Sequence, residues 1–387
     1  MPGPVPSPRF LSGRAEADSL FHLPGDGPAH DRTAANLSPQ GPRFDFVTRD
    51  PLGLRDLSLS DIVRPGAETD PVDALRSVLT AELGAAGALV FPSAADAIRG
   101  TLPAFLGPGD DVLVDSCADP VLFETVALTG ARLHRYPSAS LDGVERRLRR
   151  LARNLGAGRL VIVAPAVSAR CARVTDVAGL VELARQHGAA LVVDVAEDFG
   201  VMGQDGRGVM EIQSCLGRVD LVLGCLAGAF GTTGGFVAWG DAGRDAGLRR
   251  SRPASASLPA DRARTALAAA TLVFGAEGRR RRRRLHGLSL RLRNQLKAAG
   301  LRVPGGAVPF VPVLLPLQTA LPRTALLESA GPRVGLLMAP KVPLHAPRWR
   351  IELSALHGLA DIDDLAELIR DVSRAFDRIP GESRVPA

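Results

Sequence analysis

The chain has 387 residues, of which 46% are hydrophobic and 23% are charged, and its formal net charge is +6. This is an ordinary globular composition, and the length predicts a large core and two domains. No apolar run of about 18 residues occurs, which excludes a transmembrane helix, and the N-terminus has neither the basic start nor the apolar core of a signal peptide.

The four cysteines, Cys117, Cys171, Cys215 and Cys225, are scattered along the chain. Their spacing matches neither a metal motif nor a disulfide framework, so we predict buried free thiols in a reducing compartment. Because no leader or membrane segment is evident either, we expect a cytoplasmic protein.

The first 45 residues are rich in proline, glycine and polar side chains and show no sustained period. Such a composition predicts a flexible N-terminal tail over residues 1–45. The next segment, 46–87, is predicted to be helical, because Asp70 followed by Pro71 is typical of an N-cap and a first helical position.

Strands and helices alternate over residues 88–245, which predicts a large domain built on a doubly wound, mostly parallel sheet. The connections between them are as short as βαβ units require. The predicted strands are 88–91, 111–115, 132–136, 159–165, 190–194, 220–226 and 235–239. The predicted helices are 95–106, 120–130, 141–155 and 176–188.

Residues 246–300 are predicted to form connecting basic helices, and they contain the run of six arginines Arg279–Arg284. The run has two interpretations. It continues with helical period into a solvated helix face, or it attracts an anionic partner such as nucleic acid or a membrane surface. Residues 301–387 are predicted to form a small C-terminal α/β domain, with strands at 309–315 and 348–353 and a helix at 361–376.

The most informative stretch spans residues 190–240. The apolar strand 190–194 ends in Asp194, and an acid at the carboxyl end of a central α/β strand lies where ligands bind. The loop 227–234 is rich in small residues and includes Thr232 and Thr233, which can donate to an anion or simply shape the turn.

These residues resemble those of the α-oxoamine synthases, enzymes of aminotransferase fold type I that use pyridoxal 5'-phosphate (PLP) to join an amino acid to an acyl-CoA. The family pattern is roughly D-x-A-H-x-x-G-V-x-G-x-x-G-R-G, a spacer, then D-x-x-x-x-T-x-x-K-A-x-G-x-x-G-G. Residues 194–208 match the first part, except that Glu197 replaces the histidine. Residues 220–235 match the second, except that Gly228 replaces the lysine that holds the cofactor covalently.

The absence of that lysine has a chemical consequence. A primary amine is needed for the Schiff base and for later proton transfer, and glycine supplies neither. The chain contains only two lysines, Lys297 and Lys341, and neither lies on this loop. Any PLP is therefore expected to be held non-covalently.

The resemblance also implies roles for other residues. Asp194 would pair with the pyridine nitrogen, and Asp119 occupies the position of a histidine that stacks on the cofactor ring. The turn at Ser93 would meet the phosphate, although Ala94 replaces a glycine there. The segment 339–365 is similar to the family's ending, in which an arginine binds the substrate carboxylate. That arginine is Arg350, although Arg348 lies on the same strand face.

The sequence departs from the pattern at Gly228, Glu197 and Asp119. These departures favour a protein that retains the family's fold but has lost its catalytic activity. The chain is nearest in character to the lysine-less subunit of serine palmitoyltransferase, so the leading hypothesis is a non-catalytic or regulatory partner of an amino acid–acyl-CoA condensing enzyme. Such a protein would form a homodimer or a heterodimer with a lysine-bearing homologue. The alternatives are an active acyltransferase or aminotransferase-like enzyme with non-covalent PLP, and a binding module that uses Arg279–Arg284.

Overall fold

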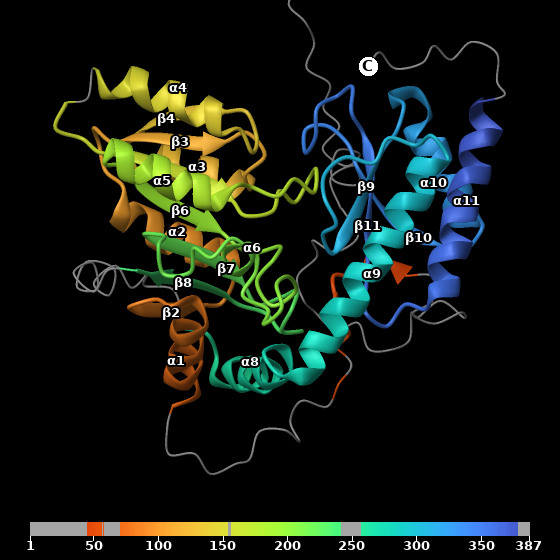
Figure 1. Ribbon diagram of the computed structural model, residues 1–387, viewed down its shortest axis with the longest axis horizontal. Helices are drawn as coiled ribbons and strands as arrows, with labels where there is room; N and C mark the ends of the chain where they lie inside the picture. The colour runs from red at the N-terminus through yellow and green to blue at the C-terminus, as the bar shows by residue number, and fades with distance from the viewer. Residues whose placement is uncertain (1–44, 56, 58–69, 154–155, 241–256, 378–387) are drawn as a thin grey trace, which may run out of the picture.

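The computed structural model describes residues 45–55, 57, 70–153, 156–240 and 257–377. The predicted tail lies outside these ranges except for its last residue. Two sheets, each covered by helices, form a large and a small domain (Figure 1). Within the described ranges no helix combines the length and the apolar character needed to cross a bilayer.

The large domain is built on a seven-stranded sheet with the order β2-β8-β7-β6-β5-β3-β4. Its strands run parallel except β8, which is antiparallel to both of its neighbours. The strands are β2 (Gly87–Phe91), β3 (Asp111–Asp115), β4 (Arg132–Tyr136), β5 (Leu160–Pro165), β6 (Ala190–Asp194), β7 (Leu221–Cys225) and β8 (Gly235–Trp239).

Helices cover both faces of this sheet, because the strands are apolar on both sides. One face carries α2 (Ala94–Phe105) and α3 (Pro120–Leu128). The other packs against α1 (Pro71–Leu83), α4 (Leu141–Ala152), α5 (Val177–His187) and α8 (Ala260–Val273), and the short α6 (Val209–Ile212) lies in the loop region after β6. Side-chain caps fix where five of these helices begin: Asp70, Ser93, Asp119, Ser140 and Asp176.

The small domain has a four-stranded sheet with the order β1-β10-β11-β9. Its core gathers around Trp349 and Ile351, which are fully buried, with leucines of α9 packed against them. The strands are β1 (Asp45–Phe46), β9 (Phe310–Leu314), β10 (Arg333–Leu337) and β11 (Arg348–Glu352). The helical elements are α9 (Ala276–Ala298), η5 (Leu317–Thr319), α10 (Ala320–Ser329) and α11 (Leu359–Asp377).

The α/β fold class is confirmed, with a doubly wound and mostly parallel sheet in the large domain. The structure differs from the expectation at the start of the described chain. Residues 46–87 are not a purely helical segment, because β1 pairs in parallel with β10 of the small domain. A strand of two residues is too short to show the alternation of apolar and polar side chains that predicts a strand, and it is recognised only by its pairing with β10. The sequence also does not predict β10 or α10.

Candidate active site

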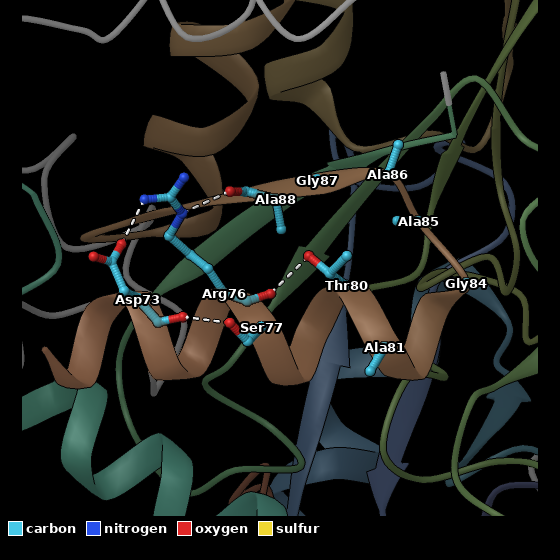
Figure 2. A pocket seen from close by; sticks show the side chains of 10 residues that line it. All are labelled: Asp73, Arg76, Ser77, Thr80, Ala81, Gly84, Ala85, Ala86, Gly87 and Ala88. Carbon is cyan, nitrogen blue, oxygen red and sulfur yellow. Dashed lines mark hydrogen bonds and ion pairs between the residues drawn. The ribbon is translucent and has the colours of Figure 1, made fainter. Parts of the chain in front are cut away.

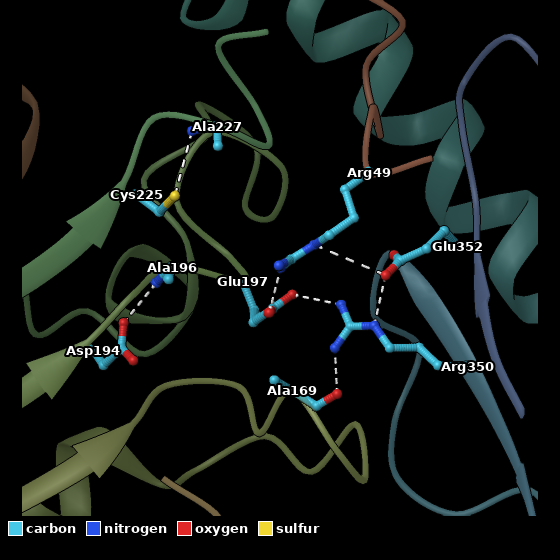
Figure 3. Close-up of polar contacts among 9 residues, drawn as sticks. All are labelled: Arg49, Ala169, Asp194, Ala196, Glu197, Cys225, Ala227, Arg350 and Glu352. Carbon is cyan, nitrogen blue, oxygen red and sulfur yellow. Dashed lines mark hydrogen bonds and ion pairs between the residues drawn. The ribbon is translucent and has the colours of Figure 1, made fainter. Parts of the chain in front are cut away.

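The candidate site lies at the carboxyl ends of β5, β6 and β7, where the small domain meets the large sheet. Ligands bind at this edge of parallel α/β sheets, because the loops that follow the strands open there. Asp194 ends β6, Cys225 ends β7, and β11 contributes Arg350. Figure 3 shows Arg49 and Arg350 pointing toward Glu197 from different segments of the chain.

Asp194 is a half-buried carboxylate that forms no ion pair among the described residues. Its Oδ1 accepts a hydrogen bond from the backbone N–H of Ala196 at 3.0 Å. Desolvation raises the pKa of Asp194 to about 7, and the negative charges of Asp119 and Glu197 act in the same direction. A cationic group would relieve this unfavourable setting, so Asp194 suits a protonated ring nitrogen.

Replacing Asp194 with asparagine should raise the free energy of unfolding near pH 8 by about 1–2 kcal/mol, since each pKa unit corresponds to about 1.4 kcal/mol and the amide needs partners of its own. Because folding raises the pKa, the carboxyl group favours the folded state most at low pH, and that stability is lost as the pH rises toward about 7. Urea denaturation near pH 8 and near pH 4 checks this: the gain should vanish at the lower pH. A variant that is less stable near pH 8 would show that the carboxylate has a favourable partner.

Glu197 is enclosed by two arginines. Arg350 donates from Nη2 to Glu197 Oε2 at 2.9 Å, and Arg49 donates from Nη2 to Oε1. The side chains of Glu197 and Arg350 are only 13% and 12% exposed. Burial alone would raise the pKa of Glu197, but Arg350 and Arg49 outweigh it and lower the pKa to about 2. Glu197 is therefore a carboxylate at neutral pH.

The guanidinium of Arg350 is fully engaged within the chain. Besides Glu197, it donates from Nε to Glu352 Oε1 at 2.6 Å and from Nη1 to the carbonyl oxygen of Ala169. Its Cζ lies 3.8 Å from the ring centroid of Phe310. An arginine with these partners has no free edge for the carboxylate of a substrate.

The two arginines of β11 have separate roles. Arg348 donates from Nε and Nη2 to the carbonyl oxygen of Ala346 at 3.1 and 3.0 Å, and from Nη1 to that of Arg170 at 3.1 Å. It contacts no acidic side chain through these bonds. Of these two arginines, Arg350 is the one that binds Glu197, which distinguishes two residues that the sequence leaves equivalent.

Gly228 lies on the loop after β7, where the family pattern has its lysine. A Cβ built on Gly228 would meet no heavy atom within 4 Å, so the backbone leaves room for a side chain. Nearby, Cys225 Sγ accepts a hydrogen bond from the N–H of Ala227 at 3.3 Å, and burial raises the pKa of its thiol. Of the two lysines, Lys297 is exposed in the last turn of α9 and Lys341 follows β10.

The expected phosphate and ring positions are occupied by acidic side chains. Ser93 caps α2, and its hydroxyl accepts from the N–H of Asp96 at 3.1 Å and donates to Asp96 Oδ2 at 2.7 Å. Asp96 therefore brings a negative charge to the helix end that would favour a phosphate. Asp119 is exposed and caps α3 by accepting from the N–H of Val121 at 2.8 Å.

The predicted loop threonines differ from each other. Thr232 is buried, and its hydroxyl has no hydrogen-bond partner among the described residues, whereas Thr233 is exposed. Among the described residues, the site thus offers one carboxylate suited to a pyridinium and one unpartnered hydroxyl, but no amine, no stacking ring, and an acid at the phosphate position. These residues do not fit a tightly held PLP.

Two charged residues of the site, Arg49 and Glu352, are not among the sequence-based predictions. Arg49 precedes the first described helix by more than twenty positions and matches no motif, yet it pairs with Glu197 and lies 3.8 Å from Glu352. Glu352 does carry a signal, because alternation along a strand places it on the same face as Arg350.

A cavity of about 890 Å³ lies between α1 and β2, away from this site (Figure 2). Its polar side chains are satisfied locally. Arg76 pairs with Asp73 at 2.7 Å and donates to the carbonyl of Ala88 at 2.9 Å, while Ser77 and Thr80 donate to carbonyls of their own helix. Since β2 runs in the same direction as β6, a cavity at the start of β2 lies at the opposite edge of the sheet.

Residues 69–369 match the family model for aminotransferase class I and II. The chain is 35% identical over 258 residues to 8-amino-7-oxononanoate synthase from Bordetella petrii, a match that covers 65% of this chain and 63% of the relative. A relative of the same name from Acidithiobacillus ferrooxidans is 32% identical over 359 residues, or 86% of this chain and 88% of the relative. The chain spans less than two thirds of the first curated relatives, with 63%, 65% and 60% of their lengths matched.

The structure is similar to serine palmitoyltransferase from Sphingomonas wittichii, with a TM-score of 0.77, 23% identity, and coverage of 87% of this chain and 88% of that one. It is also similar to 8-amino-7-oxononanoate synthase from Francisella tularensis, with a TM-score of 0.72, 20% identity, and coverage of 87% and 99%. At these identities the likeness concerns the fold.

Proposed function

Because this chain belongs to the class I and II aminotransferase family, within its α-oxoamine synthases, we propose that it is a non-catalytic partner of an amino acid–acyl-CoA condensing enzyme. The observation that carries the proposal is the ion pair between Glu197 and Arg350. Glu197 replaces a histidine of the family pattern and supplies the carboxylate that the arginine would otherwise take from a substrate. The chain fills its own substrate-binding position, and Gly228 lacks the amine.

Such a subunit would act by pairing with a lysine-bearing homologue. Active sites of oligomers can draw residues from two chains, so an inactive copy still shapes the site of its partner. The test is affinity purification of the tagged chain from its native host, followed by mass spectrometry. We expect a lysine-bearing relative in stoichiometric amount, and recovery of this chain alone, as a homodimer or monomer, would count against the proposal.

A second test restores the missing groups. We expect the double variant Gly228→Lys with Glu197→His to gain a borohydride-reducible PLP adduct on residue 228, because the backbone there leaves open space for a side chain. The unmodified chain should give no adduct. The readouts are the visible spectrum with added PLP and peptide mapping after reduction.

A matched control variant is Gly287→Lys on α9, where a Cβ also meets nothing within 4 Å. It adds a lysine in a similarly open place outside the site and should give no specific adduct. An adduct on Lys297 or Lys341 of the unmodified chain would mean that the active amine lies elsewhere, and the non-catalytic proposal would then be withdrawn.

One observation favours a second candidate function, an enzyme with non-covalently bound PLP. Asp194 has the raised pKa of an acid that lacks a cationic partner, which is the setting that a pyridinium would complete. This candidate predicts turnover of an amino acid and an acyl-CoA by the purified chain alone. The arginine run supports no third candidate, because Arg279, Arg280 and Arg281 pair with acidic side chains of this same chain.

A further inference from the structure

Two thiols from different loops meet beside the candidate site. Cys117 follows β3 and Cys171 follows β5, and their Sγ atoms lie 3.9 Å apart. Both are free thiols. Cys117 is half-buried, whereas Cys171 is only 7% exposed. A disulfide has an S–S distance of about 2 Å, so the two sulfur atoms have to approach each other by about 2 Å, through side-chain rotation or a shift of either loop.

The surroundings of the pair favour a thiolate on Cys171. The Sγ of Cys171 lies within hydrogen-bond distance of Cys117 Sγ at 3.9 Å and of the Ser168 hydroxyl at 3.1 Å. These hydrogen bonds, with the charge of Arg173, lower the pKa of Cys171 to about 6. The proton stays with the other sulfur, so the pKa of Cys117 is raised. A thiolate is the nucleophile of thiol–disulfide exchange.

We propose that Cys117 and Cys171 are a redox modification site that forms a reversible disulfide with a small-molecule disulfide, such as oxidised glutathione, as the oxidant. The proton that the pair shares moves to Cys171, so that the better exposed Cys117 attacks the oxidant as the thiolate, and one glutathione thiolate leaves. Cys171 then loses this proton to solvent, and its thiolate attacks the Cys117 sulfur of the mixed disulfide and releases the second glutathione. Two protein thiols are oxidised, and one external disulfide is reduced to two thiols.

The loop that carries Cys171 also holds the small domain. The carbonyl oxygen of Ala169 accepts from Arg350, and that of Arg170 accepts from Arg348. Arg170 in turn donates from Nη2 to the carbonyl oxygen of Ala118, next to Cys117, at 3.1 Å. Closing the disulfide links these two loops covalently, so oxidation would change how β11 is held against the large domain.

The experiment equilibrates the purified full chain in buffers with increasing ratios of oxidised to reduced glutathione, then blocks free thiols and maps peptides by mass spectrometry. We expect a peptide linked through Cys117 and Cys171 that becomes the main form at the oxidising end and disappears on reduction. Hydrogen exchange should change around residues 168–173 in the oxidised chain. Far-UV circular dichroism should stay unchanged, which shows that the link forms in the folded protein.

Single cysteine-to-serine variants test the role of each thiol separately. Cys171→Ser should accumulate a stable glutathione adduct on Cys117, because nothing displaces it, whereas Cys117→Ser should give little adduct on the buried Cys171. Cys225→Ser should leave the cross-link yield unchanged. No linked peptide, a link that forms only in urea, or a persistent mixed disulfide in the unmodified chain would each overturn the proposal. None of these readouts depends on the proposed function.

Discussion

Replacing Arg282 with methionine is expected to lower the free energy of unfolding by about 3–5 kcal/mol, because several buried carbonyl groups lose their donor at once. Arg282 is the fourth residue of the arginine run and only 4% exposed. Its guanidinium donates to the carbonyl oxygens of Gly203 at 3.2 Å, Gly200 at 3.3 Å and Gln204 at 2.8 Å, and also to that of Val273. Burial lowers the pKa of Arg282.

These contacts fix the loop that follows the site residues of β6. Gly206 on this loop has φ +90°, and its Cβ would lie 2.8 Å from Arg282 Nη1, so the glycine permits the close approach of the guanidinium. Loss of Arg282 should therefore loosen residues 200–208 before it affects the distant small domain. Hydrogen exchange on the variant should show faster exchange there.

The matched control is Arg283→Met, the next residue of the same run, whose side chain is exposed. The two substitutions have the same chemistry on the same helix, so a difference between them reports the buried contacts alone. Urea denaturation of both variants, followed by circular dichroism, measures the effect. Equal losses of stability would contradict the conclusion that the buried hydrogen bonds of Arg282 stabilise the fold.

The second large effect is expected for Glu197→Gln. Removing one charge from a nearly buried cluster leaves Arg350 and Arg49 with Glu352 alone, and breaking such a pair costs about 3 kcal/mol at neutral pH. Glutamine keeps the size of the side chain, so packing is preserved and the charge is the variable. The variant should also free one edge of Arg350 for an external carboxylate.

The pKa shift of Glu197 also predicts how the loss of stability in Glu197→Gln changes with pH. Folding lowers the pKa of Glu197 from 4.5 to about 2, so its contribution is present above pH 4.5 and is lost as the pH falls toward 2. The stability difference between the unmodified chain and Glu197→Gln should therefore be largest near neutral pH and shrink in acid. Urea midpoints measured across that range test it, and a constant difference would contradict the charge-based explanation.

An exposed carboxylate in an ion pair provides the comparison. Asp363 accepts from Arg291 at 2.6 Å, but their side chains are 40% and 43% exposed. Solvent screens such a pair, so Asp363→Asn should cost far less than Glu197→Gln. The two results together separate the effect of burial from that of pairing.

The amino-acid sequence by itself determined the strands and helices of the large domain and several candidate residues. Apolar runs bounded by turns place Asp194 at the end of a strand, and Asp70 followed by Pro71 marks where a helix begins. These signals are local, because they depend on residues adjacent along the chain. The same locality explains why the lysine missing at Gly228 is visible without any structure.

Only the tertiary structure decided what Glu197 and Arg350 do. They are separated by about 150 positions, and each matches its own motif, but the ion pair exists because β11 of the small domain lies against the loop after β6. Arg49 joins them from a segment that matches no motif. In the same way, helical spacing puts Arg282 on the same face as Leu285 and Leu292, but only the packing of α9 shows that its guanidinium meets buried carbonyl groups while Arg283 lies in solvent. Side-chain pairing over such distances depends on how domains pack, and a pattern of neighbours along the chain does not encode it.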